Sequence, residues 1–420
     1  MGLPHDKTLS STIVILGGGV GGVVTANELR RQLPPNQRVV LVEKNATHAF
    51  PPSFLWVMTG DRKPEQICRP LATLLRRGIE LVQSEVLGIN PEFRTVRTSS
   101  AEIAYDRLVV ALGADLAVDA VPRLAQASHT FFTFDGATIL RDALRAFPGG
   151  RIAVLVSALP YKCPGAPHEG AMLIADHFRQ RGLSHKVEIH LFTPEPQPMP
   201  VAGPLLGEAV RAMLQAKGIQ FHAQHKLTSV EPEARELTFE EGKRFRYDLL
   251  VAVPPHRAPK AVVAAGLTNQ AGWIPVDPQT LATSQPGIYA IGDITAIPIP
   301  GRWKLDVPLM LPKAGVFAHA QAKVIAQRVA AEIAGRPCEA TFCGAGYCIL
   351  EAGEDLAGFA FGNFFAEPAP NVQLRQIGKA WHIGKVLFEK WWLAPAGIQR
   401  SLIASTLRAA GRLYGIPIDL

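Results

Sequence analysis

The chain has 420 residues, which favours two or three packed domains. Although 48% of the residues are hydrophobic, no apolar run reaches the roughly 18 residues of a membrane-spanning helix, so we expect none. The net charge of +7 favours anionic partners without choosing among phospholipid, nucleic acid and acidic substrates. The five cysteines lack zinc-ligand spacing, so we expect thiols or catalytic sulfur and no bound metal.

A dinucleotide-binding pattern opens the chain. Residues 12–16, TIVIL, predict a short buried strand that leads into GGGVGG and then into the helical pattern VVTANELRRQL. Gly17, Gly19 and Gly22 fit the spacing G-x-G-x-x-G, which lets the backbone approach a pyrophosphate at a helix N-terminus. A second apolar strand, RVVLVE, ends at Glu43, whose carboxylate suits ribose hydroxyls. Together these features predict a dinucleotide-binding domain.

Four further apolar strands divide the chain into domains. YDRLVVALGAD (105–115) and YDLLVAVPP (247–255) are similar and bracket an inserted unit, whose first strand is RIAVLVSAL (151–159). GIYAIGDIT (287–295) is a strand that ends in Gly-Asp. We therefore predict an α/β fold with two Rossmann-like domains and a C-terminal region. The predicted boundaries are 1–115 and 251–330 for the first domain, 116–250 for the second and 331–420 for the C-terminal region.

The inserted domain carries a cysteine where a second glycine loop is expected. The strand 151–159 is followed by PYKCPGAPHE, with one glycine and three prolines, which obstructs close approach to a pyrophosphate. Cys163 then precedes a helical pattern, where the helix dipole and Lys162 favour a thiolate. Glu169, in the first helical turn, is placed to move protons. On composition alone, a buried structural cysteine is an equally good interpretation.

These motifs resemble the sulfide:quinone oxidoreductase family, which is similar to the flavoprotein subunit of flavocytochrome c sulfide dehydrogenase. CPGAPHE and the later FCGAGYCILEAG (342–353) match the two cysteine motifs of that family. The resemblance implies a redox pair, Cys163 and Cys348, with Glu169 as the family's acid. It also implies that hydrosulfide attacks the paired sulfurs, leaves polysulfide or zero-valent sulfur, and sends two electrons through FAD to quinone.

The same resemblance implies FAD as the cofactor. LPKAGVFAHAQA (311–322) fits the helix start beside the flavin, and FPPSFLWVMTG (50–60) fits the segment over the flavin ring. Because Pro51 and Pro52 stand where flavocytochrome relatives carry the linking cysteine, we expect FAD to be held non-covalently. The residues assigned to FAD are Gly17, Gly19, Gly22, Glu43, Lys44, Val86, Ala111, Gly113, Gly292, Asp293, Lys313 and Gly315.

The C-terminal region contains no haem motif, so the electrons must pass to an external acceptor. The resemblance places quinone at Lys385 and Phe388, with Tyr347 or Ile349 flanking the second cysteine. Lysine stabilises a quinone oxygen that gains electron density, and phenylalanine stacks on the ring.

The same region predicts membrane contact. WHIGKVLFEKWWL (381–393) mixes aromatic residues with lysine, as at a membrane interface. In the helix 398–415, Arg400, Arg408 and Arg412 share one arc and apolar residues fill the other side. We therefore expect a monotopic protein on an anionic membrane, on its cytoplasmic face, since MGLPHDKTLSST shows no export leader. A core-packed or dimer-forming helix is the alternative, and nucleic acid is not expected.

Three other functions remain open on the sequence. A flavocytochrome-type sulfide dehydrogenase would pass electrons to a cytochrome, and a type II NADH:quinone reductase would take them from NADH. A non-catalytic flavoprotein would bind FAD without turning over sulfide. The lost glycine loop argues against NADH, and the basic amphipathic tail argues against a soluble partner of a cytochrome.

Overall fold

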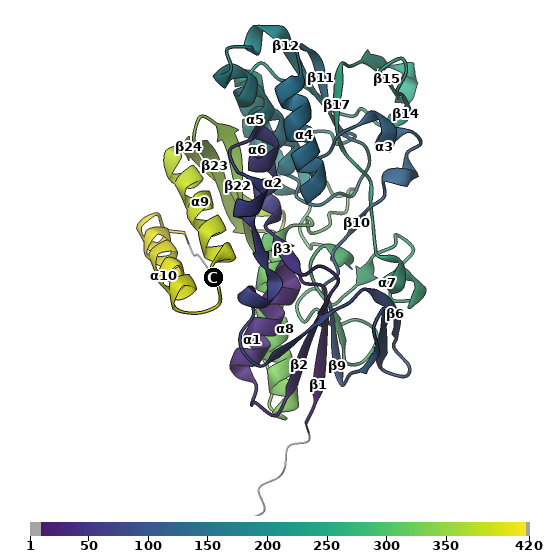
Figure 1. Ribbon diagram of the computed structural model, residues 1–420, viewed down its shortest axis with the longest axis vertical. Coiled ribbons are helices and arrows are strands. Elements are labelled where there is room, and N and C mark those ends of the chain that lie inside the picture. Colours follow the sequence, from purple (N-terminus) through teal and green to yellow (C-terminus); the bar gives the residue numbers. More distant parts are fainter. Residues whose placement is uncertain (1–9, 417–420) are drawn as a thin grey trace, which may run out of the picture.

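A five-stranded parallel sheet forms the centre of the first nucleotide-binding unit in the computed structural model, which describes residues 10–416. Its three inner strands are mostly buried apolar runs, as expected for a sheet covered on both faces. The first helix of the motif packs against a long helix that begins after the LPKAG segment (Figure 1). In spatial order the strands are β20 (Ile288–Ala290), β9 (Arg107–Val110), β1 (Thr12–Leu16), β2 (Arg38–Glu43) and β5 (Ile79–Gln83), and the helices are α1 (Val20–Gln32) and α8 (Gly315–Ile333).

A second parallel sheet forms the inserted unit, at the top of Figure 1. In spatial order its strands are β13 (Gln220–His222), β12 (Val187–Phe192), β11 (Gly150–Val156) and β17 (Leu249–Val253). Its main helices are α4 (Phe134–Ala146), α5 (Ala166–Gln180) and α6 (Pro204–Ala216). The chain enters the inserted unit through β10 (Asp115–Leu116) and leaves through β18 (His256–Arg257), and these two strands pair antiparallel. The two parallel sheets confirm the predicted α/β class.

Short elements complete these two units. The small antiparallel sheets contain β3 (Thr47–Ala49) with β4 (Cys68–Pro70), β6 (Val86–Asn90) with β7 (Thr95–Thr98) and β8 (Glu102–Ala104), and β14 (Leu227–Glu231) with β15 (Glu236–Phe239) and β16 (Arg244–Arg246). A parallel pair joins β19 (Ile274–Pro275) and β21 (Thr295–Ala296), and the short helices are α2 (Phe54–Thr59), α3 (Leu124–Ala127) and α7 (Lys260–Ala264).

The C-terminal region is an antiparallel sheet followed by two helices. The sheet contains β22 (Ala345–Gly353), β23 (Leu356–Asn363) and β24 (Asn371–Gly378), and the helices are α9 (Lys379–Leu393) and α10 (Ile398–Leu413). β22 packs against α5 of the inserted unit, and α9 packs across β23. In Figure 1 the helix pair lies on one side of both nucleotide-binding units. Within residues 10–416, no helix combines the length and apolar character needed to cross a membrane.

The aromatic residues at the end of α9 are core residues, so their predicted place at a membrane interface is wrong. Trp391 and Trp392 are 4% and 1% exposed, and the Trp392 indole donates a hydrogen bond of 2.8 Å to Nε2 of His48. The prediction failed because α9 turns this end toward the first nucleotide-binding unit, which a linear pattern does not reveal.

One arginine of the predicted basic arc also faces inward. The guanidinium of Arg400 lies 4.8 Å from the ring centroid of Trp391, and burial lowers the Arg400 pKa to about 10. Ile398, Leu402 and Leu413 are exposed instead, beside the exposed Arg412. The segment MGLPHDKTL lies outside the described residues.

Candidate active site

The glycine turn between β1 and α1 leaves open backbone for a ligand. Gly17 has φ of +101°, which favours glycine, and a Cβ on Gly22 would lie 1.8 Å from the Gly17 carbonyl oxygen. A Cβ on Gly19 would meet nothing within 4 Å, and no side chain caps α1. The Glu43 carboxylate accepts a hydrogen bond of 2.7 Å from the Gly18 amide. This uncapped helix start fits the pyrophosphate of a dinucleotide.

A buried carboxylate, that of Asp293, lies in the turn that follows β20. Oδ1 of Asp293 is buried and has no hydrogen-bond partner among residues 10–416. Burial raises the Asp293 pKa, against the opposing charges of Lys162 and Lys313. The preceding Gly292 has φ of +75°. Since buried carboxylate oxygens are normally hydrogen-bonded, this one suits a bound hydroxyl donor, and the residues present fit FAD.

Lys313 anchors the start of α8 beside that carboxylate. Its Nζ donates hydrogen bonds of 2.6 Å to the Asp293 carbonyl and 3.0 Å to the Thr295 carbonyl. The ammonium also lies 3.5 Å from the ring centroid of Trp273. Burial lowers the Lys313 pKa to about 8. Gly315 is the first residue of α8, where no side chain caps the helix.

The other residues assigned to FAD lie near the carboxyl ends of the same strands or on the neighbouring sheet. A Cβ on Gly17 would lie 2.5 Å from the Ala111 carbonyl oxygen, so the ends of β1 and β9 touch. Gly113 follows with φ of +68°. Lys44 is exposed directly after β2, and Val86 begins β6. Contacts of these residues with FAD stay predictions.

The Cys163 loop is joined to the predicted flavin site. Cys163 has φ of +58°, and its amide donates a hydrogen bond of 2.6 Å to the Lys313 carbonyl. The residue keeps accessible surface although protein atoms surround it on most sides. Burial, followed by the charge of Glu169, raises the Cys163 pKa to about 12. This upward shift opposes the predicted thiolate, and the ionisation of Cys163, which keeps accessible surface, stays a prediction.

Cys348 lies on β22, against the start of α5. A Cβ on Gly165 would lie 3.3 Å from Sγ of Cys348 and 3.6 Å from Oε2 of Glu169. The missing side chain at Gly165 therefore lets the second cysteine approach the acid. Burial first, and then Glu169 and Cys163, raise the Cys348 pKa well above its ordinary value. All five cysteines are free thiols, and these two share one electrostatic environment.

A buried ionic network surrounds the two sulfurs, and the sequence alone did not reveal it. Nζ of Lys385, on α9, lies 2.6 Å from Oε1 of Glu169, which also accepts a 3.0 Å hydrogen bond from the Glu351 amide. The Glu351 side chain is 1% exposed and lies 3.9 Å from Lys385 Nζ. Burial lowers the Lys385 pKa, but the carboxylates of Glu169 and Glu351 offset this, and the net shift is upward.

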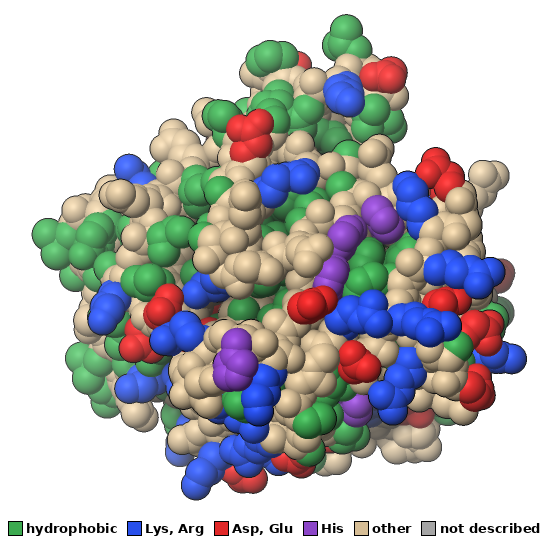
Figure 2. All heavy atoms as spheres, turned by 90° about the horizontal axis from the view of Figure 1, so that it is seen from above, with side chains coloured by type: hydrophobic (Ala, Val, Ile, Leu, Met, Phe, Trp, Pro, Cys, Tyr) green, Lys and Arg blue, Asp and Glu red, His purple; other side chains and the backbone are tan. Residues whose placement is uncertain are grey.

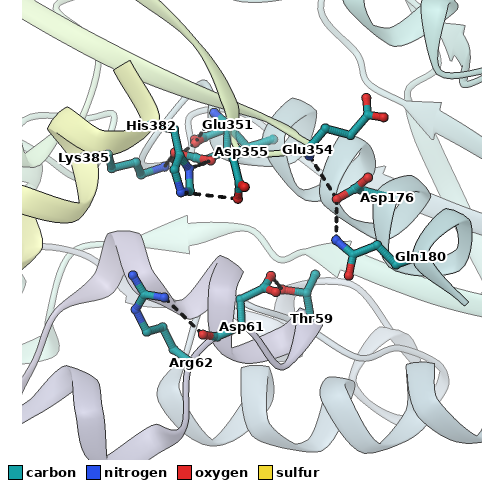
Figure 3. A network of polar contacts seen from close by, with 11 residues as sticks. Thr59, Asp61, Arg62, Asp176, Gln180, Glu351, Glu354, Asp355, His382 and Lys385 are labelled. Atoms are coloured by element: carbon teal, nitrogen blue, oxygen red, sulfur yellow. Dashed lines mark hydrogen bonds and ion pairs between the residues drawn. The ribbon is translucent and has the colours of Figure 1, made fainter. Parts of the chain in front are cut away.

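His382 completes this network on the outer side (Figure 3). Its Nδ1 lies 2.8 Å from the Glu351 carboxylate, and this hydrogen bond raises the His382 pKa. One turn of α9 separates His382 from Lys385, so both side chains reach Glu351 from the same helix. The sequence offered one clue: Glu351 is the acid of the second cysteine motif, three residues after Cys348.

Two buried side chains, Tyr161 and Glu195, lie just beyond the ends of β11 and β12 in the inserted unit. Tyr161 and Glu195 are buried, and the tyrosine hydroxyl donates a 2.9 Å hydrogen bond to the Glu195 carboxylate. Thr193 donates another, of 3.1 Å. Burial raises the Glu195 pKa to about 7. In a dinucleotide-binding relative, an acid at the end of the second strand would bind ribose; here Glu195 holds the residue two positions before Cys163.

The residues predicted for quinone lie in one aromatic cluster, except for Lys385. The Phe388 ring centroid lies 6.3 Å from that of Tyr347 and 6.0 Å from that of Phe50. Ile349 is half-buried on β22, two residues after Tyr347. The Lys385 ammonium, which was predicted to bind a quinone oxygen, forms a hydrogen bond with Glu169. A quinone role for each of these residues stays a prediction.

Comparison with known proteins agrees with this architecture. The sulfide-quinone reductase of Aquifex aeolicus is 28% identical over 92% of this chain and 91% of its own length. The solved structure of the sulfide:quinone oxidoreductase from the same organism matches with a TM-score of 0.82 and 26% identity, covering 92% of this chain and 93% of that chain. The mouse mitochondrial sulfide:quinone oxidoreductase is 27% identical over 68% of this chain and 66% of its own length.

These similarities confirm the predicted resemblance, the FAD cofactor and the class of enzyme, an oxidoreductase. The family model described as pyridine nucleotide-disulphide oxidoreductase matches residues 11–322. Since the matched residues are most of this chain, the chain belongs to the pyridine nucleotide-disulphide oxidoreductase family.

Proposed function

We propose that the protein oxidises sulfide through Cys163 and Cys348 and delivers the two electrons to a membrane quinone. One observation carries this proposal: the two cysteines share one site with the buried pair of Glu169 and Lys385, and the Cys163 loop is hydrogen-bonded to the residue two positions before α8. FAD, when bound there, supplies a two-electron acceptor that passes the electrons onward.

The sulfur steps begin from the oxidised pair. Hydrosulfide attacks the Cys163–Cys348 disulfide, forms a new sulfur–sulfur bond with one cysteine and releases the other as a thiolate. A second hydrosulfide then attacks the outer sulfur of the persulfide and leaves as a disulfane, which returns that cysteine to the thiol form. Oxidation of the two thiols to the disulfide releases two electrons and two protons, and bound FAD would be the electron acceptor.

Glu169 and Lys385 handle charge and protons in this scheme. The thiols are hard to ionise here, because burial and the Glu169 charge raise the pKa of both cysteines. A released thiolate therefore needs compensation, which the Lys385 ammonium supplies from its position beside Glu169. The Glu169 carboxylate accepts protons when the thiols are oxidised.

Quinone binding is assigned to the aromatic cluster of Phe388 and Tyr347. The two rings meet edge to face, at 86° and with centroids 6.3 Å apart, and an aromatic ring face suits stacking with a quinone ring. The exposed side chains of Ile398, Leu402 and Leu413 on α10 suit shallow docking of this end on a bilayer. Peripheral membrane attachment through α10 supplies access to a quinone dissolved in lipid.

The test is an anaerobic titration of the purified yellow protein with sulfide and, separately, with NADH. We expect sulfide to bleach the flavin absorbance, a soluble quinone analogue to restore it, and Cys163→Ser and Cys348→Ser to abolish the bleaching. Cys343→Ser is the matched control, because this exposed cysteine lies outside the site and should leave bleaching intact. Bleaching by NADH with no response to sulfide would refute the proposal.

A further inference from the structure

A cavity of about 750 Å³ lies between the first nucleotide-binding unit and the C-terminal helix pair. One wall is formed by the segment that runs from the end of α2 into β4, including Arg62 and Arg69. The opposite wall is formed by α9, the turn after it and α10. The cavity therefore opens beside the helix pair that we assign to the membrane surface.

The charged side chains of this cavity leave a positive excess. Arg62 is neutralised by Glu389, at 3.0 Å, and Glu389 also accepts a hydrogen bond from Ser53. Arg69 donates hydrogen bonds only to main-chain carbonyl groups, and Lys390 is exposed and has no ion-pair partner among residues 10–416. Since Glu389 is the one acidic residue of the described cavity lining, Arg69 and Lys390 are left without a counter-charge.

Apart from Gln66 and Gln399, the rest of the cavity lining is apolar, and it continues onto the exposed face of α10. Val386, Leu393 and Ile403 line it. On α10, Leu402 is the neighbour of Ile403 and is 65% exposed. Figure 2 shows hydrophobic and basic side chains together along its left edge, the side on which α9 and α10 lie in Figure 1. The cavity thus joins an unneutralised cationic site to an exposed apolar surface.

This cavity is separate from the aromatic cluster assigned to quinone. At 100° per residue, Val386 and Leu393 point about 150° away from Phe388 around the axis of α9. Phe388 contacts Tyr347 and Phe50, and none of these three lines the cavity. The ligand of the cavity is therefore a second molecule and not the quinone ring.

We propose that this cavity binds one anionic phospholipid, whose phosphate is held by Arg69 and Lys390 and whose acyl chains begin along Val386, Leu393 and Ile403. The inference rests on the membrane docking proposed above. Arginine and lysine together bind phosphate well, and the apolar wall excludes a free phosphate ion as the natural ligand. The volume accommodates a headgroup with the first carbons of its chains.

The experiment compares flotation of the FAD-loaded protein with vesicles of phosphatidylcholine alone and of phosphatidylcholine with phosphatidylglycerol. The cavity variant is Arg69→Gln/Lys390→Gln. The matched control is Arg94→Gln/Arg97→Gln, which removes two exposed charges from the first nucleotide-binding unit, outside the cavity and away from α9 and α10. We expect the wild type and the control to prefer phosphatidylglycerol, and the cavity variant to lose about tenfold in affinity for those vesicles.

A soluble short-chain phosphatidylglycerol gives the second measurement, by native mass spectrometry. One lipid should remain bound to the wild type and to the control, and none to the cavity variant. Equal losses in both variants, equal binding of both lipids, or displacement of the lipid by a quinone analogue would each overturn the inference. If the cavity variant loses its flavin, Lys390→Gln alone replaces it. Flavin bleaching by sulfide is recorded in parallel, so failure of the proposed reaction is seen separately from failure of lipid binding.

Discussion

Lys385 and Glu169 form a buried ion pair of 2.6 Å across 216 residues of sequence. The pair joins α9 of the C-terminal region to the first turn of α5 in the inserted unit. It therefore links the helix that carries Phe388 to the loop that carries Cys163. This contact would therefore fix the position of the predicted quinone site at Phe388 relative to the sulfur site at Cys163.

Removing the lysine should destabilise the fold strongly. Lys385→Met leaves Glu169 and Glu351 buried without their cation, which should lower the free energy of unfolding by about 3 to 5 kcal/mol. Adding Glu169→Gln should recover part of the loss, because only one of the two carboxylates then remains without the lysine. Urea unfolding measures both effects. Lys379→Met, exposed on the same helix, is the control, and an equal loss there would contradict the assignment.

His382 should make stability depend on pH near neutrality. Its hydrogen bond to Glu351 raises the folded pKa above the ordinary value of 6.5. The stabilisation is therefore complete below about pH 6.5 and is lost as the pH rises through the folded pKa. Because the ring is partly exposed, the effect should not exceed about 1 kcal/mol. Comparing unfolding of His382→Gln with that of His185→Gln, an exposed histidine, should show a pH-dependent difference only for the former.

Glu195 should change stability in the same direction as His382, but over a lower pH range. Burial raises its pKa from 4.5 to about 7, so the native state holds a proton that the unfolded state releases between these values. Stability should therefore fall as the pH rises from about 4.5 to 7, by about 3 kcal/mol at most. Glu195→Gln should remove this slope, whereas Glu208→Gln, at an exposed site, should keep it. An unchanged slope in Glu195→Gln would show that the carboxyl is ionised throughout.

Two glycines of the first motif should respond differently to alanine. Gly22→Ala places a Cβ 1.8 Å from the Gly17 carbonyl oxygen, so α1 cannot stay against β1, and the protein should fail to accumulate in soluble form. Gly19→Ala meets no protein atom within 4 Å, so the fold should persist. Its added methyl group narrows the predicted pyrophosphate site, and flavin affinity should fall. Thermal unfolding and flavin content measure the two outcomes; soluble, flavin-replete Gly22→Ala would contradict the close packing.

Phe388 offers a test of the acceptor side. Phe388→Leu removes the ring that contacts Tyr347, so the KM for a soluble quinone analogue should rise about three- to tenfold, as expected for loss of an aromatic pair. The rate of flavin bleaching by sulfide should not change. Phe93→Leu, 70% exposed, is the control. A slower bleaching step with an unchanged KM would place Phe388 on the sulfur side.

The sequence by itself determined the parts of the molecule whose chemistry is local. The glycine spacing at Gly17, Gly19 and Gly22 predicted a strand, a turn and a helix, because only a residue without a side chain permits that close approach. The sequence also showed directly that the inserted unit lacks a second glycine loop and carries Cys163 in that position. The strand β1, predicted at 12–16, has these bounds in the structure.

Only the tertiary structure decided which faces are buried, because burial depends on partners distant in sequence. Trp391, Trp392 and Arg400 look suited to a membrane in the linear pattern, yet the two tryptophans are buried and Arg400 packs against Trp391. Burial also opposes the ionisation expected for Cys163, since desolvation disfavours a charged group. The network of Glu169, Glu351 and Lys385 exists for the same reason: three charges from three separate elements are stable in the interior only where folding brings them together.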